Sequence, residues 1–313
     1  QYAINLSLFR DCTGISLLNT TTVNITSSVC GVSNVPMSLV GVPIDVTPLC
    51  SSQIQNSACS GGTGIYGVEE WIYRGIVTLP ATCANANDIV LSWSVCCRNG
   101  AITTLTNSGS LYLYANLDNS LVGGNSSPAF NNDPTLYLCS NQENRYNSGM
   151  TDVENDDLVY SLVNCKESAT QDVTYNSGLS GTNPLNATAA SINPQTGEVV
   201  VIPSTNQVAV ICILIEEYRN GVKISEVIRD LQFTVTDCGG NSLPIISGIN
   251  PKSFKSLGIT YCSKFLSSTR SSFFEALYPT ACIFKRLLII LSTPSKAPPA
   301  TNKMLRVLTS TNF

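Results

Sequence analysis

The 313-residue chain contains no histidine. Without it there can be no Ser-His-Asp or Cys-His nucleophile, no HExxH zinc site and no histidine pH switch. Charged residues make up only 12% of the chain, and the net charge of −4 gives no electrostatic reason to bind nucleic acid. No run of about 18 apolar residues is free of charge, so we expect no transmembrane helix. The chain opens at Gln1 without a signal peptide, so we expect a secreted form to be a mature chain or a fragment.

The sequence also lacks the short motifs of common enzymes. There is no GxSxG elbow, and the glycine cluster at residues 61–64 lacks the Lys-Ser/Thr step of a phosphate loop. Two adjacent acid pairs, Glu69–Glu70 and Glu216–Glu217, could suggest a glycosidase. Adjacent strand residues point to opposite faces, so neither pair makes a dyad, and we expect exposed positions. A histidine-free carboxylate hydrolase built from distant acids stays open.

Cysteine, in contrast, is abundant, with thirteen residues and no CxxC pair. Without CxxC or histidine, zinc explains them poorly, so we expect disulfides and an extracellular or outer cell-surface location. The candidates before residue 239 are Cys12, Cys30, Cys50, Cys59, Cys83, Cys96, Cys97, Cys139, Cys165, Cys212 and Cys238.

Three pairings are reasonable expectations, although spacing alone leaves other connectivities open. They are Cys12–Cys30, Cys50–Cys59, and Cys83 with Cys96 or Cys97. Adjacent strand residues face opposite sides, so we expect Cys96 and Cys97 to take different partners. A redox-active thiol is the alternative, but the sequence offers it no CxxC motif and, apart from Arg98, no basic neighbour.

Residues 1–124 predict a disulfide-rich all-β domain. Residues 2–8 alternate apolar and polar side chains, as a half-buried strand does. Further strand-like runs lie at residues 23–25, 68–79, 89–95 and 111–117. Asn99–Gly100 stands between two strand-like runs and predicts a tight hairpin.

Residues 125–238 predict a second all-β domain, of the Ig-like or cadherin-like kind. Its strand-like runs are 136–138, 158–162, 173–175, 199–201, 208–218, 222–224 and 231–235. A hairpin is expected at Asn220–Gly221. The overall expectation is therefore two tandem antiparallel β-sandwiches.

Residues 239–313 differ from the rest, because they carry nine basic residues and one acid, whereas residues 1–238 carry eight and twenty. Residues 292–303 are linker-like, and residues 273–291 could form a basic helix that touches a membrane. We expect an irregular or partly helical tail of low order, or sequence that is foreign to the native protein.

Four acids near the start of a strand predict a calcium site. Asp152, Glu154, Asp156 and Asp157 recur around Asn155, which permits a bend, and Ca²⁺ takes about six to eight oxygen ligands. The alternative is a solvated acidic turn.

Two predicted hairpin tips are candidate contact sites for a partner. Arg98 with Asn99 and Arg219 with Asn220 each stand at such a tip. A charged tip that only keeps the sheet soluble is the alternative.

Several motifs resemble secreted surface proteins of Bacteroidota that carry a gliding-motility C-terminal sorting domain. They include residues 4–14 (INLSLFRDCTG), 96–99 (CCRN) and 217–221 (EYRNG). The resemblance covers residues 1–238 in order and ends near Cys238. In the same way, residues 152–162 and 192–199 resemble the acidic loop and the turn of cadherin-like domains, with Glu154 and Asn155 where those domains have Asp and Gly.

The resemblance implies a secreted adhesin-type array and not an enzyme. Together with the composition, it predicts a structural or adhesion module that is stiffened by disulfides and a candidate Ca²⁺ ion. Expected partners are other surface proteins, glycans or a second copy. A carbohydrate-binding accessory module is the main alternative.

Overall fold

The computed structural model describes residues 1–239 and 303–310, apart from 50–51, 64, 123 and 135–136. The described chain is all-β, as predicted, and its helices are short 3₁₀ turns. These are η1 (Ile54–Asn56), η2 (Ala58–Ser60) and η3 (Ala81–Asn85).

The strands, in chain order, are β1 (Tyr2–Asp11), β2 (Thr20–Ser27), β3 (Gly31–Leu39), β4 (Ile44–Asp45), β5 (Val68–Val77), β6 (Ile89–Val95), β7 (Leu111–Leu117), β8 (Tyr137–Cys139), β9 (Asn144–Asn147), β10 (Asp157–Val163), β11 (Ala187–Ile192), β12 (Glu198–Pro203), β13 (Gln207–Arg219), β14 (Val222–Thr236) and β15 (Lys303–Ser310).

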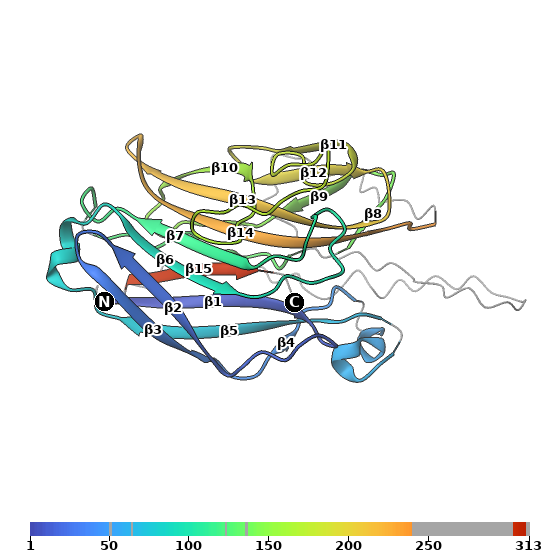
Figure 1. Ribbon diagram of the computed structural model, residues 1–313, viewed down its shortest axis with the longest axis horizontal. Coiled ribbons are helices and arrows are strands. Elements are labelled where there is room, and N and C mark those ends of the chain that lie inside the picture. Colours follow the sequence, from blue (N-terminus) through green and yellow to red (C-terminus); the bar gives the residue numbers. More distant parts are fainter. Residues whose placement is uncertain (50–51, 64, 123, 135–136, 240–302, 311–313) are drawn as a thin grey trace, which may run out of the picture.

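Twelve of these strands form one large sheet. Its order is β10-β13-β14-β15-β1-β5-β3-β2-β6-β7, with β4 paired to β5 and β8 to β14. Because β14 also pairs with β7, the strand order returns on itself. In Figure 1 the blue and teal strands make the lower layer, and β10, β13 and β14 lie above them. Strands β11, β12 and β9 form a separate small sheet.

Strand β1 follows from its sequence alternation. Ile4, Leu6 and Leu8 are at most 1% exposed, while Asn5 and Ser7 on the other face are half-buried. Its antiparallel register with β5 runs unbroken from Tyr2 opposite Val77 to Asp11 opposite Val68. The predicted strand at residues 2–8 is therefore confirmed.

The hairpin between β13 and β14 is also confirmed. Asn220 and Gly221 are its two loop residues, with φ of 54° and 78°. Positive φ at both positions is the requirement of a type I′ turn, which asparagine and glycine meet at low cost. The hairpin joins the two longest strands in the described part of the chain.

The hydrophobic core runs without a break through both predicted domains. One cluster of buried side chains includes Leu91 and Leu113 as well as Ile211 and Phe233. Tyr146 packs edge-on against Phe233, with ring centroids 5.8 Å apart. The two predicted domains thus share packing, and the boundary at residue 124 stays a prediction.

Polar contacts also join the two halves. Strand β7 pairs with β14 at Ser225–Val227, and Thr103 N donates to Val208 O at 2.8 Å. The Arg98 guanidinium reaches Asp230 of β14, where it forms a buried ion pair at 2.7 Å. The loop between β6 and β7 therefore lies against the second half of the chain.

The hairpin expected at Asn99–Gly100 is wrong. Strand β6 ends at Val95 and the next strand begins at Leu111, so a long loop separates them. The loop packs on its neighbours instead of turning back at once, because Arg98 N donates to Ser108 O and Gly109 O. The strand expected at residues 173–175 is likewise limited to isolated bridges at Asp172 and Tyr175.

The C-terminal expectation is wrong for residues 303–310. These residues form β15, which pairs in parallel with β1 and, at Arg229 and Asp230, with β14. The reason is that β1 has β5 on one side only, and its other edge accepts a strand. The expected helix at 273–291 and most of the expected linker lie outside the described residues.

Five disulfides lie among the described residues, and they differ from the expected pairings. They are Cys12–Cys59, Cys30–Cys83, Cys96–Cys97, Cys139–Cys238 and Cys165–Cys212. Four of them join residues 47 to 99 positions apart. They therefore fasten distant segments, whereas the expected pairs were mostly local.

Each expected pairing fails for a structural reason. Turn η2 places Cys59 beside the end of β1, so it bonds to Cys12 and not to Cys50, which itself lies outside the described residues. Turn η3 places Cys83 beside Cys30. Both Cys96 and Cys97 follow the end of β6, so the strand rule of opposite faces does not apply, and they bond to each other.

Candidate functional site

Three carboxylates converge near the tip of the long hairpin. Asp152, Asp156 and Glu217 each offer one oxygen, and these oxygens lie within 4.8 Å of one another. Ligand oxygens lie about 2.3–2.6 Å from Ca²⁺, so two ligands of one ion are at most about 5 Å apart. The carboxylate cluster Asp152–Asp156–Glu217 therefore has the spacing and donor type of a hard-cation site.

The loop at residues 152–156 brings two of these acids together. Thr151 pairs with Ala129 just before the loop, and β10 begins at Asp157 just after it. Between them Asn155 adopts a φ of 61°, a left-handed conformation that asparagine tolerates better than most residues. Asp156 N donates to Asp152 Oδ1 at 2.7 Å, which closes the bend.

Glu217 comes from β13 and is fully buried, so the expectation of an exposed position is wrong. Ile213, Ile215 and Glu217 are successive members of the buried face of β13, and each is at most 1% exposed. Side chains two residues apart in a strand share a face, so Glu217 lies on the same face as Ile213 and Ile215. The apolar run alone did not show which of the two adjacent acids, Glu216 or Glu217, would lie on that face.

Asn125 and Arg219 hold the carboxylate cluster by hydrogen bonds. Asn125 lies at the predicted boundary between the two halves of the chain. Asn125 is 1% exposed, and its Nδ2 donates to both Glu217 oxygens at 3.1 Å. Its Oδ1 accepts from Arg219 Nη2 at 2.9 Å, and Arg219 Nε donates to Asp156 Oδ1 at 2.7 Å. Asp156 thus has a cationic partner, whereas Glu217 accepts hydrogen bonds from the neutral amide of Asn125.

The cluster is electrostatically unbalanced. Burial is the largest cause that raises the pKa of Glu217 to about 9, and the charges of Asp152 and Asp156 contribute to this rise, whereas the Asn125 hydrogen bond opposes it. At neutral pH Glu217 therefore holds a proton unless a cation takes the place of that proton. Asp152 Oδ2 is buried and has no hydrogen-bond partner among the described residues.

Two of the four predicted metal ligands lie outside this cluster. Asp152 and Asp156 belong to it, whereas the side chains of Glu154 and Asp157 are exposed. In an extended loop, the side chains of every second residue point in the same direction. Asn155 adopts a left-handed conformation, so the loop is not extended there and this alternation does not hold.

Arg98 does not stand at an exposed hairpin tip, so the expectation for it is wrong. It is 3% exposed, and its guanidinium donates to both oxygens of Asp230, at 3.1 and 2.7 Å. It also donates to the backbone oxygens of Ser110 and Lys166. Asn99 is half-buried, with its Oδ1 bound to Ala101 N. Arg98 thus joins the two halves from within.

The second predicted hairpin tip, at Arg219 and Asn220, is present in the structure, but only part of it faces solvent. Asn220 is exposed at the turn of the β13–β14 hairpin. Arg219 turns its guanidinium to Asp156 and Asn125, so its charge is committed to the carboxylate cluster. Of these two residues, Asn220 is therefore the better candidate for contact with a partner.

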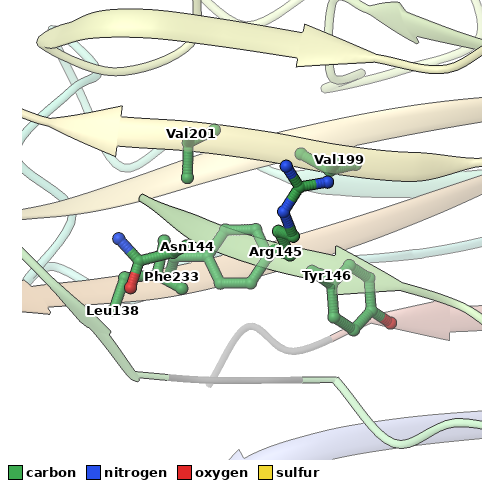
Figure 2. Close-up of a pocket in the computed structure, with 7 residues that line it drawn as sticks. All are labelled: Leu138, Asn144, Arg145, Tyr146, Val199, Val201 and Phe233. Carbon is green, nitrogen blue, oxygen red and sulfur yellow. The ribbon is translucent and has the colours of Figure 1, made fainter. Parts of the chain in front are cut away.

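An apolar hollow lies between β9, β12 and β14 (Figure 2). Tyr146 of β9, Val199 and Val201 of β12 and Phe233 of β14 line it, together with Leu138, Asn144 and Arg145. It is too narrow to admit a water molecule. The hollow is therefore a packing gap and not a ligand site.

Comparison with protein-family profiles, with curated proteins and with solved structures finds no match for this chain. The resemblance of residues 1–238 to secreted Bacteroidota surface proteins therefore stays a prediction. None of the helices in the described part of the chain has the length and apolar character that a bilayer crossing requires.

Proposed function

We propose that this protein is a non-catalytic structural or adhesion module that acts outside the cytoplasm. The observation that carries the proposal is the set of four disulfides between distant segments, with separations of 47 to 99 residues. Such bonds persist in oxidising compartments and are rare in the cytosol. The proposed architecture is two β-sandwich units that share one core and face another surface protein, a glycan or a second copy.

The placement of the bridges supports a mechanical role. Cys139–Cys238 fastens β8 to the end of β14, and Cys165–Cys212 links the end of β10 to β13. In the first half, Cys12–Cys59 ties the end of β1 to turn η2. Each bond restricts the unfolded chain and adds about 2–5 kcal/mol to stability, more for the longer loops. Because these disulfides link distant segments, they limit how far the chain can be extended under force.

Calcium is the second part of the proposal. The carboxylate cluster supplies three hard oxygen donors, and the buried Asp152 Oδ2 lacks a hydrogen-bond partner among the described residues. A divalent cation would displace the Glu217 proton and offset the repulsion among the three acids. Backbone oxygens and water would complete its coordination. Bound there, the ion would stiffen the junction at Asn125.

A carboxylate hydrolase fits this cluster less well than a cation does. Hydrolysis of a glycosidic bond needs two carboxyl groups about 5–10 Å apart, with substrate between them. The oxygens of the cluster lie closer than that, and Glu217 is 0% exposed. A substrate oxygen would have no approach to Glu217.

The disulfide part is tested on protein taken from its own source. Non-reducing peptide mapping should recover the four long-range bridges, and labelling of intact cells with an impermeant reagent should mark the protein. Free thiols at these eight cysteines, or protein confined to the cytosol, would refute the proposal.

The calcium part is tested by thermal melting with millimolar Ca²⁺ and with a chelator. Saturation at about 100 times Kd adds about 2.7 kcal/mol, so Tm should rise and then fall back on chelation. Asp152→Asn should abolish the rise, whereas Glu154→Gln, outside the cluster, should retain it. An equal response of the two variants, or no response of the wild type, would remove calcium from the proposal.

A further inference from the structure

The disulfide Cys96–Cys97 differs from the other four in exposure. Both of its residues are exposed, whereas the other eight bonded cysteines are buried or half-buried. Cys165 and Cys212, for example, are 0% exposed. Thiol–disulfide exchange requires a thiolate to reach a sulfur atom directly. Among the described bridges, this one is the most open to attack.

It also differs in what it holds together. It joins neighbours in the chain, with a separation of 1, whereas the others span 47, 53, 99 and 47 residues. A bond between neighbours closes almost no loop, so it barely restricts the unfolded chain. The fold therefore does not depend on it in the way that it depends on the long-range bridges.

The chain is fixed on both sides of the pair. On one side, Val95 ends β6 opposite Leu111 of β7. On the other side, Arg98 N donates to Ser108 O and Gly109 O, and the Arg98 guanidinium is bound to Asp230. Opening the bond between these two anchors would leave the sheet and the buried ion pair in place.

We propose that Cys96–Cys97 is a reversible thiol-exchange site whose substrate is a dithiol; the location of that dithiol outside the cell rests on the proposed function. The other four disulfides are structural. An exposed bridge of this kind, which no long loop depends on, fits the labile class and not the structural one.

A thiolate of the dithiol attacks one sulfur of the pair, which forms a mixed disulfide and releases the other cysteine as a thiolate that takes up a proton. The second thiol of the reagent then displaces the protein sulfur. The products are Cys96 and Cys97 as free thiols and the reagent as its disulfide, after the transfer of two electrons and two protons. Oxidation by a disulfide reagent runs the same steps in reverse.

The test is a reduction time course on the folded, full-length protein with dithiothreitol. Samples are quenched with acid and alkylated, and peptide mass spectrometry then measures the reduced fraction of each pair. Cys96–Cys97 should be reduced at least ten times faster than any of the other four. At that stage Tm should stay within about 2 °C, and added oxidised dithiothreitol should restore the bond. A reduced thioredoxin-type protein, used in a second arm, distinguishes a protein dithiol from a small one.

Two outcomes would overturn the proposal. One is reduction of another pair first or at the same rate; the other is a loss of tertiary structure that accompanies opening of Cys96–Cys97. As a matched pair, C96S/C97S should lose the fast phase and keep its Tm, while C165S/C212S should keep the fast phase and lose stability. If C165S/C212S fails to fold, the wild-type time course alone still decides.

Discussion

Loss of the Arg98 guanidinium should destabilise the protein strongly, because Arg98 joins the two halves from within. In Arg98→Met, a side chain of similar length replaces a guanidinium that is 0% exposed and contacts both oxygens of Asp230. The Asp230 carboxylate, 1% exposed, then loses the cation that faces both of its oxygens. The Ser110 and Lys166 oxygens each lose a donor as well.

The magnitude follows from this burial. Removal of one partner of a buried ion pair costs about 3–5 kcal/mol, mostly because a charge is left behind in a poorly solvated site. An exposed pair is worth about 0.2–1 kcal/mol. Arg145, which is 54% exposed beside Glu143 and Glu198, supplies the matched control. Arg98→Met should therefore cost several times more than Arg145→Met.

Urea unfolding followed by tryptophan fluorescence measures both variants. The double variant Arg98→Met/Asp230→Leu should cost less than the sum of its single changes by about 1–3 kcal/mol, since it leaves no charge behind. Two results would refute the claim that this pair joins the halves. One is a cost of Arg98→Met below about 1 kcal/mol, and the other is a cost of the double variant equal to the sum of the costs of the two single variants.

Three further outcomes are expected. Without metal, the raised pKa of Glu217 means that its contribution to stability is complete below about pH 4.5 and is lost as pH rises to about 9, so Glu217→Gln should flatten the fall in Tm over that range, and an unchanged slope would contradict the burial argument. Gly221→Val forces a β-branched residue to a φ of 78° and should cost about 1–2 kcal/mol, measured by Tm against Gly100→Val, where a Cβ meets no neighbour and φ is ordinary. The double variant C139S/C238S opens a loop of 99 residues and should cost about 4–5 kcal/mol in urea unfolding, whereas a loss under 1 kcal/mol would show that the bridge constrains little.

Strand positions were predictable where one face is buried along the whole strand. β1 and β7 alternate clearly, and β13 stands out as a long apolar run; the structure confirms all three. β3 was missed because it contains Pro36, which normally argues against a strand. Pro36 lies opposite Thr22 of β2, whereas the pairing of β3 with β5 covers only Ser38 and Leu39.

Contacts between distant segments were not predictable in the same way. Cys12 and Cys59 are 47 residues apart, and only the placement of turn η2 beside the end of β1 brings them together. Local spacing cannot give such pairs. The carboxylate cluster was half predictable: Asp152 and Asp156 share a loop, whereas Glu217 arrives from β13.

Strand β14 has a practical consequence for experiments that cut the protein into pieces. Because β14 also pairs with β7, a fragment of residues 1–124 would expose an edge of β7 that is covered in the whole chain. Unpaired edges of this kind recruit other chains and aggregate. Recombinant fragments should therefore retain residues 222–236, and clumping of a shorter piece would say nothing about whether its sequence can fold in its natural setting.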